Sequence, residues 1–93
     1  TMISSLENNI ILKNWGEAQS TIENIEKDWT KTKKTWALFL DHTEIDNIDE
    51  ALSKLKKYID TREPSLALAE ASTLKLFIVH IPEKEALNLE NIF

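Results

Sequence analysis

Cysteine is absent from this chain of 93 residues, and the chain has only one glycine and two prolines. Without cysteine there is no disulfide, no thiolate metal ligand and no thiol nucleophile. So few turn-forming residues argue against an all-β or loop-rich fold, because closely spaced turns need glycine and proline. No segment approaches the roughly 20 apolar residues of a membrane-spanning helix, and no signal-peptide pattern is present.

Basic residues are also fewer than acidic residues. The chain has 11 Lys and Arg against 16 Asp and Glu, which gives a formal net charge of -5. A nucleic-acid-binding domain usually has a net basic surface, so nucleic acid is not an expected partner. The contents of 42% hydrophobic and 29% charged residues are those of an ordinary globular protein. The length predicts one domain over residues 1–93.

Helical periodicity is what the sequence does contain. Apolar residues recur at spacings of three and four in four stretches, which predicts an all-α fold: an antiparallel bundle of three to four helices. The first stretch ends near Lys13, and the third runs from Ile45 to Ile59. The second is the clearest, and its apolar seam consists of Trp15, Ala18, Ile22, Ile25, Trp29, Thr32, Trp36 and Phe39.

The fourth stretch, about residues 64–80, carries two apolar stripes. A helix that is apolar over so much of its circumference is either the most buried helix or the carrier of a partner surface. Pro82 ends it, and Asn88 can cap a short helical turn that folds the C-terminus back onto the bundle. The stripes are Ala67, Ala71, Leu74, Ile78 and Ile81, and Leu66, Ala69, Thr73 and Phe77.

Polar and titratable residues interrupt these patterns at residues 41–46, where the apolar register jumps by five residues. A new helix therefore begins here, capped by Asp41 with Glu44 or by Thr43 with Asp46. If the third and fourth helices form a hairpin about residues 62–63, acidic and histidine side chains gather at one end of the bundle. The predicted polar cluster consists of Asp41, His42, Glu44, Asp46, His80, Glu83 and Glu85.

This cluster has two interpretations. His42 and His80 with the Asp46 carboxylate are ligand types that suit zinc or a similar divalent transition metal. The structural interpretation is that acidic residues at a helix start and a histidine at a helix end satisfy the helix dipole and cap the backbone. The sequence contains no HExxH motif and no EF-hand spacing, which favours the structural interpretation and predicts no cofactor. No group supplies an oxyanion hole beside His42, so we expect no enzyme.

Several segments resemble a known family when they are taken together. The most specific are Asp41-His42-x-Glu44-Ile45-Asp46 and His80-Ile81-Pro82-x-Lys84-Glu85; others are Asn14-Trp15, Trp29 with Trp36, and the ending Leu89-Glu90-Asn91-Ile92. They resemble a bacterial family catalogued as domain of unknown function 4363, over nearly the whole chain. The resemblance implies an N-terminal membrane helix followed by a helical domain outside the cytoplasm, so the chain is expected to be the soluble part. It implies no activity.

The sequence therefore favours a non-enzymatic helical interaction or scaffold module at a membrane surface. Its expected partner is a protein, either a membrane protein or a second copy, and its expected membrane attachment is an anchor that this chain lacks. The alternative hypothesis is a module that binds or senses a divalent metal through His42 and His80.

Overall fold

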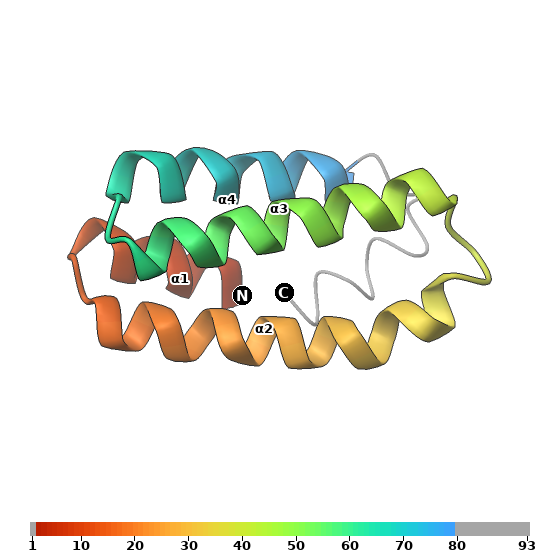
Figure 1. Cartoon of the computed structure of the whole chain (residues 1–93), viewed down its shortest axis with the longest axis horizontal. Coiled ribbons are helices and arrows are strands. Elements are labelled where there is room, and N and C mark those ends of the chain that lie inside the picture. Colours follow the sequence, from red (N-terminus) through yellow and green to blue (C-terminus); the bar gives the residue numbers. More distant parts are fainter. Residues whose placement is uncertain (1, 80–93) are drawn as a thin grey trace.

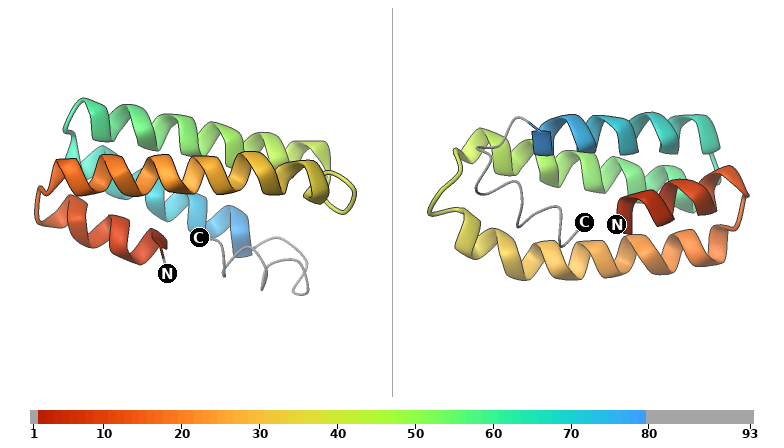
Figure 2. Two further views of the ribbon diagram at one scale, coloured as in Figure 1. Left: turned by 90° about the horizontal axis from the view of Figure 1, so that it is seen from below. Right: turned by 180° about the vertical axis from the view of Figure 1, so that it is seen from behind.

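The computed structural model describes residues 2–79, which form four α-helices (Figure 1). They are α1 (Met2–Ile11), α2 (Trp15–Trp36), α3 (His42–Asp60) and α4 (Pro64–Val79). Consecutive helices run antiparallel and pack side by side, and α1 closes the bundle against α4 (Figure 2). The predicted all-α antiparallel bundle is confirmed, with four helices. The turn predicted near Asn88 lies outside the described residues.

The core is made of one apolar stripe from each helix, as the three-four spacing predicts. No polar or charged residue within residues 2–79 is buried as a whole. The buried residues are Ile3, Leu6 and Ile10 from α1; Ala18, Ile22, Ile25, Trp29 and Trp36 from α2; Ile45, Ile48, Ala51, Leu52, Leu55 and Ile59 from α3; Ala67, Ala71, Leu74 and Ile78 from α4; and Leu40.

The end of α2 differs from the prediction. The helix ends at Trp36, and Phe39, which was placed in the seam, is 61% exposed, whereas Leu40 is buried. The backbone N–H groups of Leu38 and Phe39 donate to carbonyls three residues back, those of Thr35 and Trp36. This tighter turn ends the α-helical register, so Leu40 takes the core position instead of Phe39.

Two helices end on a residue with left-handed backbone that is not glycine. After α1, the Asn14 N–H donates to the Asn9 carbonyl at 2.8 Å, and Lys13 has a φ of 57°. After α3, the Glu63 N–H donates to the Tyr58 carbonyl at 2.9 Å, and Arg62 has a φ of 56°. Both ends are Schellman motifs, in which the left-handed residue lets the chain turn and satisfies the last carbonyls.

Of the two stripes predicted for α4, one is buried within the described residues, where Ala67, Ala71, Leu74 and Ile78 face the core. Its last member, Ile81, and Pro82, which was predicted to end the helix, lie outside those residues. In the other stripe Leu66 is 46% exposed and Ala69 is exposed, whereas Phe77 is half-buried and packs against the core. α4 is therefore not buried all round. None of the helices within residues 2–79 is long and apolar enough to cross a membrane.

Candidate functional site

Asp41 and Glu44, two members of the predicted polar cluster, form the start of α3. They make a capping box in which the Glu44 Oε2 accepts a hydrogen bond from the Asp41 backbone N–H at 3.3 Å. This is the first of the two capping pairs that the sequence allowed. A capping box satisfies backbone N–H groups that have no partner inside the helix, so both side chains have a structural role.

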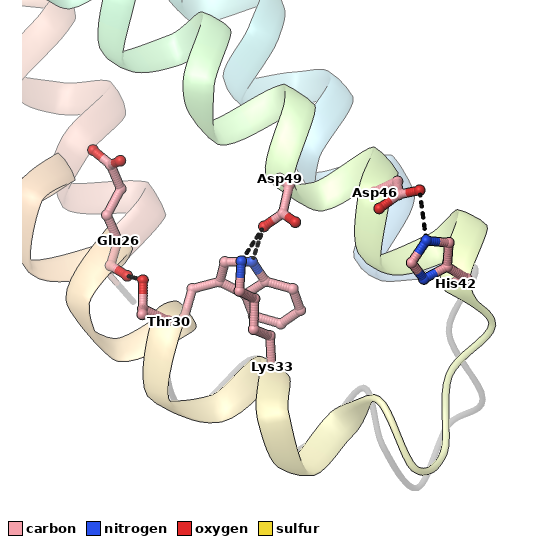
Figure 3. A network of polar contacts seen from close by, with 7 residues as sticks. Glu26, Thr30, Lys33, His42, Asp46 and Asp49 are labelled. Atoms are coloured by element: carbon pink, nitrogen blue, oxygen red, sulfur yellow. Dashed lines mark hydrogen bonds and ion pairs between the residues drawn. The ribbon is translucent and has the colours of Figure 1, made fainter.

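His42 and Asp46 lie one turn apart on the outside of α3 (Figure 3). The His42 Nε2 is 3.5 Å from the Asp46 Oδ2, and the two side chains are 92% and 60% exposed. No set of three His, Cys, Asp or Glu side chains within residues 2–79 is placed to hold a metal ion. The other predicted members, His80, Glu83 and Glu85, lie outside the described residues, so the predicted gathering stays a prediction.

A groove of about 150 Å³ lies between α2 and α3, and Asp49 in its lining follows Asp46 by three residues along α3. Both helices contribute polar side chains to it, and Figure 3 shows several of them pointing toward one another. Its lining residues are Glu26, Trp29, Thr30, Lys33, Asp49, Leu52 and Ser53. The volume is enough for a few water molecules and is below the 300–1,000 Å³ typical of ligand pockets.

Asp49 holds the two sides of the groove together. The Trp29 Nε1–H donates to the Asp49 Oδ1 at 2.7 Å, and the Lys33 Nζ lies 3.4 Å from the same oxygen. Trp29 is only 2% exposed, so its indole N–H needs a protein acceptor, and a carboxylate makes a strong one. This contact holds α2 against α3. The charges of Asp49 and Lys33 are paired with each other, so a ligand in the groove would compete with that pair.

Glu26, at the other end of the groove, has a buried Oε1 that makes no hydrogen bond. Burial raises the pKa of Glu26 above its usual value, and the charges of Asp60 and Glu23 raise it further, while Lys56 lowers it. The Thr30 hydroxyl donates to the backbone carbonyl of Glu26 at 2.8 Å. Among the lining residues no hydroxyl is bonded to a base, so the groove offers no activated nucleophile.

The sequence did not identify Asp49 or Lys33 as members of a site. Asp49 directly follows Ile48 at the edge of the buried stripe of α3, and Trp29 was assigned only to the core. A buried indole requires an acceptor, so an acidic residue that borders the facing stripe was the available signal.

Besides the groove, the outward side of α4 is a candidate functional surface, because it exposes apolar side chains. Its exposed side chains are Ser65, Leu66, Ala69, Ser72, Lys75 and Leu76, with Leu66 and Leu76 at 46% and 59%. Thr73 is half-buried beside them, and its hydroxyl donates to the Ala69 carbonyl of its own helix at 3.1 Å. We call Leu66, Ala69, Thr73 and Leu76 the α4 seam.

The charged residues of α4 lie beside this seam and interact within the chain. Lys75 forms an ion pair with Glu7 of α1. The pKa of Lys54 in α3 is raised mainly by its hydrogen bond with Glu50 and by the charge of Glu50, and then by the charge of Glu70. Glu70 therefore lies toward α3, and the α4 seam itself carries no charge.

The outer faces of α2 and α3 are different, because charged side chains occupy them along their length. The exposed charged residues are Glu17, Glu23, Lys27, Lys31 and Lys34 in α2, and Asp46, Glu50, Lys54, Lys57 and Asp60 in α3. Outside α4, the large exposed apolar residues of the described chain are at helix ends and turns: Ile11, Leu12, Leu38 and Phe39.

No curated protein and no solved structure matches the chain. A family model does match it, from residue 1 to residue 92, which is essentially the whole chain. The match agrees with the resemblance carried by the segments at residues 41–46 and 80–85. The protein belongs to the family described as Domain of unknown function (DUF4363).

Proposed function

We propose that the domain is a non-enzymatic interaction module that works at a membrane surface and presents the outward side of α4 to a protein partner. The observation that carries the proposal is the uncharged α4 seam, which contrasts with the charged outer faces of α2 and α3. Burying an exposed leucine side chain contributes about 1.5–3 kcal/mol, and the seam has one at each end.

The free-energy penalty for removing water from the α4 seam is also small. The Thr73 hydroxyl already has its acceptor, and the neighbouring charges of Glu70 and Lys75 have their own interactions with α3 and α1. A partner that covers the seam therefore removes water from few unsatisfied polar groups, which keeps the desolvation penalty of association small. The charged faces of α2 and α3 lack this property.

The non-enzymatic part of the proposal is supported by the groove between α2 and α3. Its carboxylate at Asp49 is held by Trp29 and Lys33, and its lining residues include no activated nucleophile. The membrane-surface part is supported by the family resemblance, which implies a membrane helix ahead of the helical domain.

Site-specific photo-crosslinking in native membranes tests the proposal. A benzophenone amino acid replaces Leu66 or Leu76 in the α4 seam. The matched controls are Leu12 and Leu38, which are 74% and 80% exposed and lie in the turns that follow α1 and α2. We expect a discrete protein adduct from the two seam positions and none from the controls. Adducts of equal yield at all four positions, or no adduct at the seam, would contradict the proposal.

A further inference from the structure

We propose that the second half of α2, on its outer side, binds the surface of an anionic lipid bilayer together with the turn that follows it. The surface consists of Lys27, Lys31, Lys34, Leu38 and Phe39, which we call the α2 patch. This lipid contact deepens the proposed function and rests on it, because it names how a module at a membrane would touch the bilayer. It uses α2 and not the α4 seam, so the two contacts can be tested separately.

The three lysines form one basic stripe along α2. They follow one another at spacings of four and three residues, which places them on one side of the helix, and all three are exposed. No exposed residue between positions 27 and 40 is acidic, whereas the exposed charged residues of the first half of α2 are Glu17 and Glu23. A chain with a net charge of -5 therefore has a local basic surface about 10 Å long.

No carboxylate within residues 2–79 forms an ion pair with these three lysines. Several other lysines do pair with carboxylates; they are Lys33, Lys54, Lys56 and Lys75. The helix dipole favours basic residues only in the last turn of a helix, which accounts for Lys34 but not for Lys27 or Lys31. The charge of the stripe is therefore available to an anionic ligand.

Two large apolar side chains lie at the end of this stripe, in the turn after α2. Leu38 and Phe39 are both mostly exposed. Their backbone N–H groups are held by the Thr35 and Trp36 carbonyls, and the Phe39 ring packs edge-on against the Trp36 ring with centroids 5.9 Å apart. The turn therefore presents an ordered apolar tip beside the basic stripe.

An anionic bilayer matches both parts of the α2 patch. Its headgroups attract the lysines, and its acyl layer, slightly deeper, takes up apolar side chains. Nucleic acid has no acyl layer for Leu38 and Phe39, and an acidic protein would need an apolar pocket beside its carboxylates. A bilayer requires no pocket in the chain, and none of the patch residues lines the groove between α2 and α3.

The charges around the patch set the strength to expect. Each lysine close to an anionic bilayer strengthens binding about fivefold, so three lysines together give about 100-fold. Asp41 and Glu44 follow the apolar tip at the start of α3, and their charges oppose this attraction. The contact is therefore weak and reversible, and the end of α2 at Leu38 lies closest to the bilayer.

Co-sedimentation of the purified chain with lipid vesicles is the first test. The vesicles contain phosphatidylcholine with about one third phosphatidylserine, and vesicles of phosphatidylcholine alone are the reference. We expect binding to the anionic vesicles to be at least about tenfold stronger. Salt at about 1 M, which shortens the Debye length to about 3 Å, should remove most of this difference. A chain that does not bind the anionic vesicles, or binds both kinds equally, overturns the proposal.

Two variants that each lose three positive charges separate the α2 patch from net charge. The first combines Lys27→Gln, Lys31→Gln and Lys34→Gln. The matched control combines Lys13→Gln, Lys57→Gln and Arg62→Gln, at exposed positions near the opposite end of the bundle (Figure 1). Glutamine and lysine have similar helix propensities, so both variants should fold, which their Tm checks. We expect at least about a tenfold loss of vesicle binding in the first variant and little in the control; equal losses overturn the proposal.

A fluorescent label then tests whether the apolar tip enters the acyl layer, and the lack of native cysteine allows a single label. Leu38→Cys carries an environment-sensitive dye, and Leu12→Cys, in the exposed turn after α1, is the matched control. We expect anionic vesicles to shift the dye emission to the blue at position 38 and to leave it unchanged at position 12. No shift at position 38, or equal shifts at both positions, overturns the proposal.

Polyglutamate, a soluble polyanion, distinguishes a bilayer from an acidic protein as the partner. It supplies carboxylates without an acyl layer, so we expect it to bind the chain much more weakly than the anionic vesicles do. Polyglutamate that binds as tightly as the vesicles makes an acidic polypeptide the partner, and the lipid proposal is then wrong.

The lipid contact and the protein contact can fail independently. If the chain does not bind vesicles while the photo-crosslinker at Leu66 or Leu76 captures a membrane protein, the lipid contact is wrong and the interaction function stands. If the vesicles bind through the α2 patch and the α4 seam gives no adduct, the protein partner is wrong and the lipid contact stands.

Discussion

The left-handed residues that follow α1 and α3 allow a test by glycine and alanine substitution. At these two positions glycine should be more stable than alanine, whereas in the middle of a helix the order should be reversed. Lys13 and Arg62 have φ values of 57° and 56°. A residue with a Cβ atom is disfavoured in this conformation by about 1–2 kcal/mol. Glycine has no such strain, but its freedom in the unfolded chain opposes folding by about 0.5–1 kcal/mol. Glycine at either site should therefore be more stable than alanine by about 0.5–1 kcal/mol.

The comparison of glycine with alanine at the same position removes the effect of losing the basic side chain. Lys27, exposed in the middle of α2, is the matched control, because there glycine should be less stable than alanine by about 1 kcal/mol. Urea denaturation gives the free energy of unfolding of each variant, and the gain at Lys13 or Arg62 corresponds to a rise in Tm of about 2–8 °C. A glycine variant less stable than the alanine variant at Lys13 and Arg62, as at Lys27, would refute the reasoning.

Three further predictions concern the groove and the start of α3. In a double-mutant cycle measured by urea denaturation, Trp29→Phe and Asp49→Ala should show a coupling free energy of about 1.5–3 kcal/mol, the value for a hydrogen bond to a charged group. If the two losses of stability simply add, the contact does not contribute. Glu26→Gln should raise the Tm at pH 7, because the raised pKa means that the ionised carboxylate opposes folding, and the gain should shrink as the pH falls through that pKa toward 4; a gain independent of pH would exclude this cause. Zinc at micromolar concentration should leave the Tm unchanged if His42 has only Asp46 beside it, whereas a rise lost in both His42→Ala and His80→Ala would establish the metal hypothesis.

Most of the fold could be predicted because each helix has one apolar stripe at regular spacing. The stripes of α2 and α3 specify which residues enter the core, and the break at residues 40–45 specifies where α3 begins. Hydrophobic periodicity reports burial and says little about backbone conformation at helix ends. For that reason the periodicity predicted that α2 continues to Phe39, although the helix ends at Trp36.

Glycine does not mark the left-handed turns of this chain. Gly16 lies in the first turn of α2 and has no positive φ, whereas the left-handed residue ahead of α2 is Lys13. A Schellman motif is stabilised by its two backbone hydrogen bonds, so the side chain at the turn is not decisive. The predicted site was limited in another way. The capping role of Asp41 and Glu44 follows from local spacing, whereas the role of Asp49 depends on Trp29 of another helix, which local spacing does not reveal.

The closure of the bundle by α1 has a consequence for how the protein opens and folds. Of the four closely packed helix pairs, three join helices that follow one another in the chain, and α1 with α4 joins distant segments, with the ion pair between Glu7 and Lys75 at the contact. Local pairs form early because little chain entropy is lost in closing them. A helix of 10 residues is too short to persist by itself, so the contact between α1 and α4 should form late and open first. We therefore expect the amide hydrogens of α1 to exchange with solvent ahead of global unfolding.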